Sequence, residues 1–378
     1  MSTHAPVPIR WRVRLKAEWL LITFGTLTLG LALIDPHPVA SYRHWLQLPT
    51  LAGLLGLLIA IQGIRDSGWV QRAAVAMVLR MHSLRSLGLL LVATTALLSM
   101  LLTNDVSLFL IVPLTLAVGA ITNLPVARLV VLEALAVNAG STLSPIGNPQ
   151  NLLLWQYSKL SFVRFAWTML PAAAVMLGLV AVLAIFWLPR QRVTLAPENI
   201  DETPISSRLG AGSLAALLGM VLMIEYGHAP LGAAVLLMFY VLLARSSLAQ
   251  VDWLLLITFA AIFVGLGQLA EWPSIRHALD QLNFHQPLTL YASGIVASQL
   301  ISNVPATVLL LDRVPDVMAL AVAVNVGGFG IVFGSLANLI ALRLAKQPHG
   351  LRLFHLLSIP FLLLCAPLVY LVWRWIHP

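Results

Sequence analysis

Charged residues are scarce in this sequence. Only 10% of its 378 residues are Asp, Glu, Lys or Arg, whereas 60% are hydrophobic and the mean hydropathy is +0.92. A soluble domain carries about 25% charged and about 45–50% apolar residues. The composition therefore excludes an ordinary soluble protein and predicts an all-α polytopic membrane protein.

Other absences exclude several kinds of function. Cys365 is the only cysteine, so the chain has no disulfide framework and no cysteine-based metal site. No nucleotide-binding loop of the G-x-x-x-x-G-K-[ST] kind occurs, which argues against an ATP-driven pump. Neither a catalytic Ser–His pair nor a His–Glu metal cluster stands out, so we expect no enzyme. We expect no cofactor either, apart from Na⁺ or H⁺ as a coupling ion.

The cations lie between the hydrophobic runs, so the net charge of +8 orients membrane spans and predicts no nucleic-acid partner. A topology with nine crossings and two re-entrant hairpins places most of the 22 lysines and arginines on one side, including Arg10, Arg12, Arg14 and Lys16. The positive-inside rule makes that side the cytoplasm. The N-terminus, read as leading into an uncleaved first span, is then cytoplasmic, and the C-terminus is periplasmic.

The stretch from Asn138 to Asn151 reads N-A-G-S-T-L-S-P-I-G-N-P-Q-N and interrupts an apolar region. Pro145 and Pro149 each remove a backbone donor, and Gly140 and Gly147 loosen the backbone, so no regular helix is expected here. In lipid, each unsatisfied backbone group would cost several kcal/mol. Such backbone is tolerated only inside protein or beside a wet cavity, which makes the stretch a candidate ion or substrate site.

Two apolar segments turn back at polar tips. Residues 84–119 are predicted to form a re-entrant hairpin with the tip Thr103-Asn104-Asp105, because the second arm, Val106–Val118, is shorter than the ~20 residues of a span. Two full spans joined by a tight turn are the alternative. Residues 288–316 are predicted to form the second hairpin, with its tip at Ser302-Asn303.

An internal repeat relates the two halves. The hairpin segment Ser99-Met-Leu-Leu-Thr-Asn aligns with Ser298-Gln-Leu-Ile-Ser-Asn. An odd number of crossings separates the two tips, so the second copy is inverted, as in many secondary transporters. The following residues of the first interrupted helix align without a gap: Asn138, Gly140, Gly147 and Asn151 with Asn325, Gly327, Gly334 and Asn338.

The repeat divides the chain into two halves. The N-terminal repeat covers residues 1–188 and contains the interrupted helix 126–158. A cytoplasmic linker follows at 189–208. The C-terminal inverted repeat covers residues 209–378 and contains the second interrupted helix, 317–346.

Four motifs carry a family resemblance. They are the tip T-N-D-V with the following Val112-Pro113, the loop N-A-G-S-T-L-S-P-I-G-N-P-Q-N, the tip S-N-V-P-A and the loop N-V-G-G-F-G-I-V-F-G-S-L-A-N-L. The chain resembles the ArsB/NhaD branch of the ion transporter superfamily, which includes the divalent-anion:sodium symporters, and in particular the small YbiR-type permeases of the bacterial inner membrane. The resemblance implies a scaffold, a moving part made of hairpins and interrupted helices, an elevator mechanism and often a homodimer.

In this family the two tips and two loops jointly form the substrate and cation sites. The resemblance, with the oxygen-rich composition, makes the following residues candidate ligands: Thr103, Asn104, Asp105, Asn138, Ser141, Thr142, Ser144, Gly147, Asn148, Asn151, Ser302, Asn303, Asn325, Gly334, Ser335 and Asn338. Na⁺ is expected at Asn104, Ser144 and Asn148, and half-helix N-termini would attract an anion. The alternative is that these side chains only cap and join helices.

Two acids are candidates for proton coupling. Burial favours the neutral form of a carboxyl group, so Asp105 could bind and release a proton. It could instead accept backbone donors at the start of the second arm; the second copy has Val304 at this position. Glu133 could relay protons, orient the loop or pair with Arg128.

The expected function is secondary active transport of a small inorganic or carboxylate anion, such as an oxyanion, across the bacterial inner membrane, coupled to H⁺ or Na⁺. The expected partners are this substrate, the lipid bilayer and a second copy of the chain. A Na⁺/H⁺ antiporter that uses Asp105 is one alternative. An uncoupled channel or membrane sensor is another.

Overall fold

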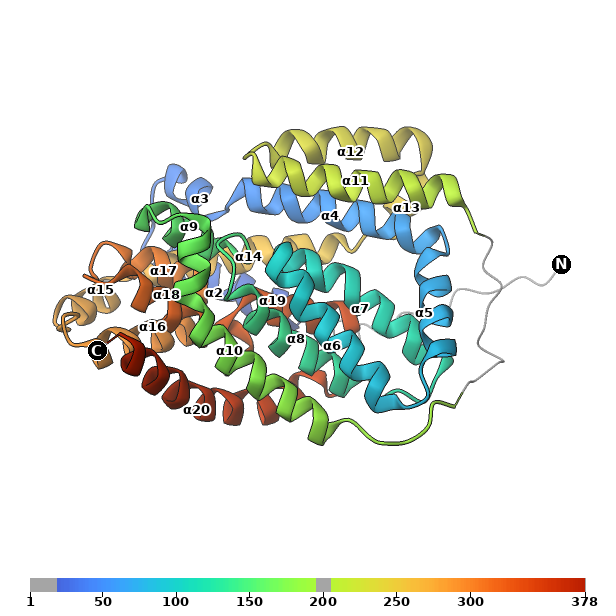
Figure 1. Ribbon diagram of the computed structural model, residues 1–378. Helices are drawn as coiled ribbons and strands as arrows, with labels where there is room; N and C mark the ends of the chain where they lie inside the picture. Colours follow the sequence, from blue (N-terminus) through green and yellow to red (C-terminus); the bar gives the residue numbers. More distant parts are fainter. Residues whose placement is uncertain (1–18, 195–204, 378) are drawn as a thin grey trace.

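Helices account for the regular secondary structure of the computed structural model, which describes residues 19–194 and 205–377 (Figure 1). Within these ranges no strand occurs, and an isolated β-bridge joins Ser83 to Arg192. The predicted all-α fold is confirmed. The basic residues Arg10 to Lys16 and the middle of the expected linker lie outside the described residues, so the structure does not address them.

Seven helices in the described part of the chain are long and apolar enough to cross a membrane. They are α4 (Leu48–Asp66), α6 (Leu84–Leu101), α7 (Asn104–Ile121), α10 (Phe162–Trp187), α11 (Ser207–Glu225), α14 (Trp253–Ala270) and α20 (Gly350–Ile376). Two shorter apolar helices, α2 (Trp19–Ile34) and α12 (Ala229–Leu243), lie beside them. The chain is a polytopic membrane protein.

Short helices connect these spans. They are α3 (Val39–Trp45), α5 (Trp69–Arg80), α13 (Arg245–Ala249) and α15 (Pro273–Asp280). Helix α5 runs across the ends of α4 and α7 in Figure 1. It buries Ala74 and Val78 and exposes Arg72 and Arg80, as expected of an amphipathic helix at a membrane surface.

Helices α6 and α7 form the first hairpin. Its two ends lie at the same end of the molecule, because Ser83 bridges to Arg192 and the Thr194 N–H donates to Asn123 Oδ1 at 3.1 Å. The expectation of a short second arm was wrong. Helix α7 has 18 residues, since it begins directly at the tip and continues through Pro113 to Ile121.

The first interrupted helix consists of α8 (Val126–Ser141) and α9 (Pro149–Ser158). The break covers only residues 142–148, so Asn138 and Asn151 are helical and the expected irregular stretch was too wide. Pro149 is the first residue of α9, where the missing N–H would have had no helical partner. The prolines therefore set where the helix resumes.

The second half repeats this order with one more span before its hairpin. The hairpin is α16 (Pro287–Ile301) and α17 (Asn303–Leu311). The interrupted helix is α18 (Val317–Val326), a 3₁₀ turn η2 (Val332–Gly334) and α19 (Leu336–Ala345). An ion pair of 3.3 Å between Arg313 and Asp280 joins the segments that flank the hairpin.

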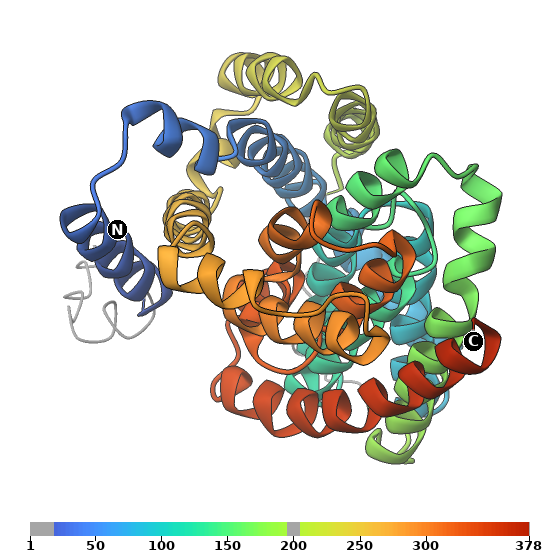
Figure 2. The same ribbon diagram turned by 90° about the vertical axis from the view of Figure 1, so that its left-hand side faces the viewer.

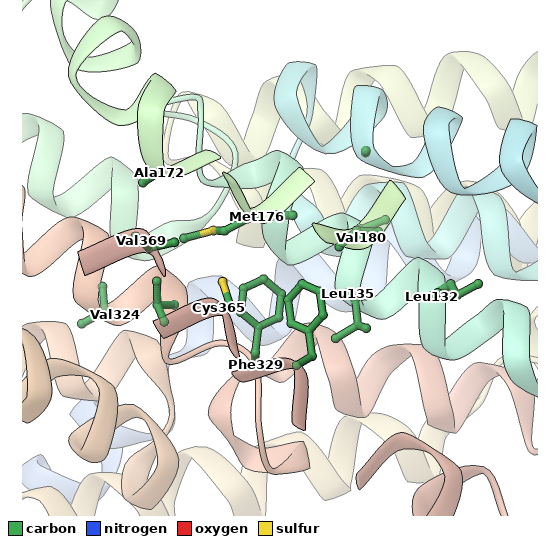
Figure 3. Close-up of a cluster of buried hydrophobic side chains, with 14 of the residues drawn as sticks. Leu132, Leu135, Ala172, Met176, Val180, Val324, Phe329, Cys365 and Val369 are labelled. Atoms are coloured by element: carbon green, nitrogen blue, oxygen red, sulfur yellow. The ribbon is translucent and has the colours of Figure 1, made fainter. Parts of the chain in front are cut away.

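Two hydrophobic cores enclose the interrupted helices. One core joins α8, α18 and both hairpins to α10 and α20; Figure 3 shows Leu135 of α8, Met176 of α10 and Cys365 of α20 around Phe329. The other joins α8, α7 and α19 to α4, α11, α12 and α14. Seen along the helices, α11 and α12 lie at one edge and α20 at the opposite edge (Figure 2). Helix α8 belongs to both cores and is buried from residue 129 to its end.

Candidate functional site

Reciprocal amide bonds join the two breaks in the interior. Asn138 Nδ2 donates to Asn338 Oδ1 at 2.8 Å, and Asn325 Nδ2 donates to Asn151 Oδ1 at 2.6 Å. Asn138 aligns with Asn325, and Asn151 aligns with Asn338. The two bonds are therefore copies of each other, related by the inverted repeat. We call these four residues the asparagine lattice.

The remaining amide donors of the lattice follow the same symmetry. Asn138 and Asn325 each donate to the carbonyl oxygen four residues earlier, Ala134 at 2.9 Å and Ala321 at 2.7 Å. Asn151 donates to Ser141 O at 3.1 Å, and Asn338 donates to the aligned Gly328 O at 2.9 Å. All four side chains are buried. The lattice thus satisfies backbone groups that the broken helices leave free and holds the halves together.

Most of the hydrogen bonds that hold the first break come from its own residues. Asn151 Nδ2 also donates to Thr142 O at 3.1 Å and Ser144 O at 3.0 Å. Asn148 caps α9 by accepting from the Asn151 N–H at 2.8 Å, and its Nδ2 donates to Ser141 Oγ at 3.1 Å and Asn325 Oδ1 at 2.9 Å. This arrangement explains why the segment carries so many amides.

The three oxygens expected to hold Na⁺ are buried and already accept backbone donors. Asn148 Oδ1 accepts from Asn151, Ser144 Oγ accepts from the Ile146 N–H at 3.2 Å, and Asn104 Oδ1 accepts from the Asp105 N–H at 2.8 Å. Each such oxygen has a second lone pair. Hard cations prefer oxygen ligands of this type. The donor set suits Na⁺, and its role as a Na⁺ site stays a prediction.

The second break is held by side chains from neighbouring elements. Gln299 of α16 donates through Nε2 to Gly327 O at 2.6 Å and Phe329 O at 2.9 Å, and its Oε1 accepts from the Ile331 N–H at 2.8 Å. From α20, Ser358 Oγ accepts from the Gly330 N–H at 2.9 Å and His355 Nε2 accepts from the Val332 N–H at 3.1 Å.

These three anchors were missed from the sequence. Gln299 had a signal, because a single amide interrupts an otherwise apolar arm one turn before the tip. Ser358 and His355 lie on the last span, far along the chain from the break, and carried no such signal. Ser335, a predicted ligand, caps α19 by accepting from the Ala337 N–H at 3.3 Å.

The two hairpin tips differ in backbone geometry. Thr103 has an ordinary φ of −84° and caps α7, its Oγ1 accepting from the Val106 N–H at 3.3 Å. The Asn104 N–H donates to Gly147 O at 2.8 Å, which fixes the first tip to the first break. Ser302 has φ 71° and ψ 155°, a region that non-glycine residues rarely occupy, and makes no side-chain cap. Ser302 Oγ donates instead to Asn303 Oδ1 at 3.4 Å.

Asp105 is partly buried in the first turn of α7, next to the first tip. Among the described residues, its carboxylate has neither a hydrogen-bond partner nor an ion-pair partner. The alternative capping role was wrong, because Thr103 caps the helix. Its carboxyl group lies beside the positive end of the α7 dipole, which would favour the ionised form.

Glu133 lies one and a half turns before Asn138 and is fully buried. Thr115 Oγ1 of α7 donates to Glu133 Oε1 at 2.5 Å. The alternative pairing with Arg128 was wrong. The Arg128 side chain is exposed, and its guanidinium lies 5.7 Å from the centre of the Trp187 ring.

The two predicted glycine ligands lie where the backbone folds closely on itself. A Cβ at Gly147 would lie 2.3 Å from Ser141 O, and one at Gly334 would lie 2.5 Å from Gly327 O. Any side chain would push the two ends of a break apart. Of the remaining candidates, Thr142 Oγ1 donates to Asn138 O at 2.8 Å within the first break.

The ends of eight helices lie at the tips and breaks. Helices α6 and α16 end at the tips where α7 and α17 begin, and α8 and α18 end at the breaks after which α9 and α19 begin. Helix N-termini present N–H donors and partial positive charge, whereas C-termini present carbonyl oxygens and partial negative charge. The centre of the repeat therefore combines groups suited to anions with groups suited to cations.

A family model described as CitMHS, citrate transporter, matches residues 15–317. The chain belongs to the citrate transporter family. This confirms its place in the ion transporter superfamily, and the chain is a membrane transporter and not an enzyme.

Three related proteins support the assignment, two of them over most of their length. The inner membrane protein YbiR of Escherichia coli is 39% identical over 354 residues, which cover 93% of this chain and 94% of YbiR. An uncharacterized transporter of Methanocaldococcus jannaschii is 31% identical over 86% of this chain and 88% of its own. The silicon efflux transporter LSI3 of Oryza sativa is 29% identical over 47% of this chain and 38% of its own.

Proposed function

We propose that this transporter is a secondary active carrier of a small inorganic or carboxylate anion, such as an oxyanion, across the bacterial inner membrane, driven by H⁺ or Na⁺. The observation that carries the proposal is that four helix N-termini and four helix C-termini lie at the tips and breaks of the two repeats, whose breaks are bonded to each other. Secondary transporters with interrupted helices bind substrate and coupling ion at such a place. The names of relatives, a citrate transporter family and a silicon efflux transporter, fit this class of substrate.

At the centre, the helix N-termini suit an anion and the side-chain oxygens suit a cation. The start of α7 at Asn104 and the start of α17 at Asn303 offer dipole ends to an anion, since the described spans place no lysine or arginine beside them. Asn104, Ser144 and Asn148 supply oxygens for a cation. A cation bound there would offset the charge of the anion and favour its binding.

Two separately packed groups of helices support an elevator mechanism. Helix α10 packs against α6, α8 and α18, and α20 packs against α8, α10 and α18, whereas α11 and α12 pack mainly with α4 and with each other at the far edge (Figure 2). In the proposed cycle, the first group moves past the second and carries the site between the compartments. The orientation that we propose, from the distribution of the cations, has a cytoplasmic N-terminus and a periplasmic C-terminus.

Uptake into proteoliposomes tests the proposal. Citrate, phosphate and arsenite are offered one at a time, with an inward proton gradient, an inward Na⁺ gradient or neither. We expect one of these solutes to accumulate above its external concentration only when an ion gradient is present. The accumulated solute should leave the vesicles when an ionophore collapses that gradient. Equilibration that never exceeds the external concentration would make the protein a channel and overturn the proposal.

A Na⁺/H⁺ antiporter is the second candidate, because Asp105 lies at the first tip and its carboxyl group has no partner among the residues that the structure describes. In vesicles that hold a pH gradient and no organic anion, added Na⁺ would then discharge the gradient. Asp105→Asn should abolish that discharge. A wild-type protein that leaves the gradient intact would exclude this candidate while leaving anion transport open.

A further inference from the structure

The carboxyl group of Glu133 is only half satisfied. Oε1 accepts from Thr115 Oγ1, whereas Oε2 is buried and finds no hydrogen-bond partner among residues 19–194 and 205–377. Every residue of α8 from Leu129 to Ser141 is buried, so no lipid or water surface lies beside this side chain. Buried polar atoms in native proteins are nearly always paired, and exceptions tend to have a functional explanation.

Within the described part of the chain, no positive charge compensates this carboxyl group. Helix α8 packs against α6, α7, α10, α19 and α20. Their titratable and charged residues are Arg85, Asp105, Arg164, Arg343, Arg352, His355, Cys365, Tyr370 and Arg374. None of them bonds to Glu133. Arg85 donates to Leu188 O, and Arg343 lies 3.8 Å from Asp252.

An ionised carboxylate cannot be stable in this environment. The effective cost of burying an unpaired ion is several kcal/mol, and a single hydroxyl donor does not offset it. A neutral carboxylic acid avoids this cost. In this conformation Glu133 therefore carries a proton, and its carboxyl group shares a hydrogen bond with Thr115.

The fold does not require an acid at this position. In the ungapped alignment of the two interrupted helices, Glu133 corresponds to Leu320. Leu320 is fully buried at the equivalent place in α18. An apolar side chain thus satisfies the same packing in the second half, and the acid of the first half needs a reason other than packing.

We propose that Glu133 is a proton-binding site of the transport cycle, separate from the ligands at the centre, and that Thr115 is its positioning residue. The inference rests on the proposed function and specifies H⁺ as a coupling ion. When the cycle exposes this part of α8, the Glu133 O–H bond breaks and the proton passes to water. The carboxylate is reprotonated from the other compartment before it is buried again.

Infrared difference spectroscopy tests the bound proton without any substrate. Purified wild-type protein should show the carbonyl stretch of a protonated carboxylic acid at neutral pH, and Glu133→Gln should lack that component. Glu271→Gln is the control, because Glu271 lies at the end of α14 and accepts from Trp45 Nε1 at 3.0 Å. A Glu133→Gln spectrum that keeps the whole band would overturn the assignment.

Transport assays test the coupling role. For citrate, Glu133→Gln should lower uptake driven by a proton gradient about tenfold or more, while exchange of labelled for unlabelled citrate stays within about threefold. Exchange needs no release of the proton, whereas net uptake does. Accumulation by Glu133→Gln equal to that of the wild type would show that the acid is structural.

Thr115→Val gives an independent measure. Thr115 donates to the carboxylate, so its loss destabilises the ionised form, and the pH profile of net uptake should shift towards higher pH. A purely structural role would lower uptake equally at every pH. If the wild type transports no tested solute but shows the acid band that Glu133→Gln lacks, the proposed function fails and the proton site remains.

Discussion

The two interrupted helices share a fold and differ in what holds their breaks. In the first half, Asn148 and Asn151 bind the carbonyls and N–H groups of their own segment. In the second half, Gln299 of the hairpin and two side chains of α20 form hydrogen bonds with the backbone of the break. The second break is therefore linked to two other helices, and a movement of either helix would be transmitted to it.

The halves also differ in their acids and in their tips. Asp105 and Glu133 belong to the first half, and the aligned residues are Val304 and Leu320. The first tip has relaxed backbone and is bonded to Gly147, whereas the second tip is strained at Ser302. The asparagine lattice is what both halves retain. This division suggests that ionisable chemistry resides in the first half and conformational linkage in the second.

The largest expected effect concerns a contact that both halves share. A Cβ at Gly140 would lie 2.3 Å from Ala96 O, and one at Gly327 would lie 2.5 Å from Ser298 Cβ. Gly140→Ala and Gly327→Ala should each destabilise the protein by about 1–3 kcal/mol, because overpacking forces the helices apart. Gly140→Ala should cost more, since a backbone carbonyl cannot rotate away. Thermal unfolding in detergent measures both.

Gly212 on α11 supplies the control for these variants. A Cβ there would meet no atom within 4 Å, so Gly212→Ala should leave the unfolding temperature unchanged or slightly higher. Equal stability of Gly140→Ala and Gly212→Ala would mean that the close approach of α6 and α8 is not needed.

A second variant tests the linkage between the second hairpin and its break. The first half has Met100 where the second has Gln299, so Gln299→Met removes the amide while keeping a side chain of similar length. Three hydrogen bonds are lost and buried backbone groups stay unpaired, which should lower the free energy of unfolding by about 1–3 kcal/mol.

Hydrogen exchange locates this effect. The Ile331 amide should exchange faster in Gln299→Met, while the Ile146 amide, held by Ser144, should keep its wild-type rate. Met100→Gln is the reverse control. It should not slow exchange at the first break, because side chains of that segment already form hydrogen bonds with its backbone. Equal acceleration at both breaks would indicate general loosening and contradict a specific linkage.

The smallest expected effects are two changes in stability of opposite sign. Ser302→Gly should stabilise the protein by about 1 kcal/mol, because glycine adopts φ 71° and ψ 155° without strain. Thr103→Gly should destabilise it by a few tenths of a kcal/mol through loss of the α7 cap. Chemical denaturation of the two variants side by side would show the opposite signs, and two changes of the same sign would contradict the inferred difference between the tips.

Prediction from the sequence was most accurate where the backbone itself is constrained. Pro145, Pro149 and the aligned glycines located both breaks. The span of the first break was overestimated, because Asn138 and Asn151 continue the helices through bonds to residues far away in the sequence. The length of α7 was underestimated at both ends. The helix already includes the polar residues Asn104 and Asp105, and it continues past Val118 to Ile121.

From the sequence alone, the candidate ligands could not be sorted into side chains that bind one another and side chains that are free to bind a ligand. It placed the asparagines, serines and threonines at the tips and breaks without indicating which would bind one another. Only the structure shows that Asn138, Asn151, Asn325 and Asn338 form a lattice, that Thr103 caps α7 and that Arg128 lies away from Glu133.

Composition, hydrophobic runs and backbone-breaking residues determined by themselves that this chain is an all-α polytopic membrane protein with two interrupted helices. These properties follow from local steric limits and from the cost of placing polar backbone in lipid, and both can be read along one chain. Tertiary structure decided the partner of each buried polar group. A hydrogen bond forms between whichever donors and acceptors packing brings within about 3 Å, and here packing joins residues from opposite halves.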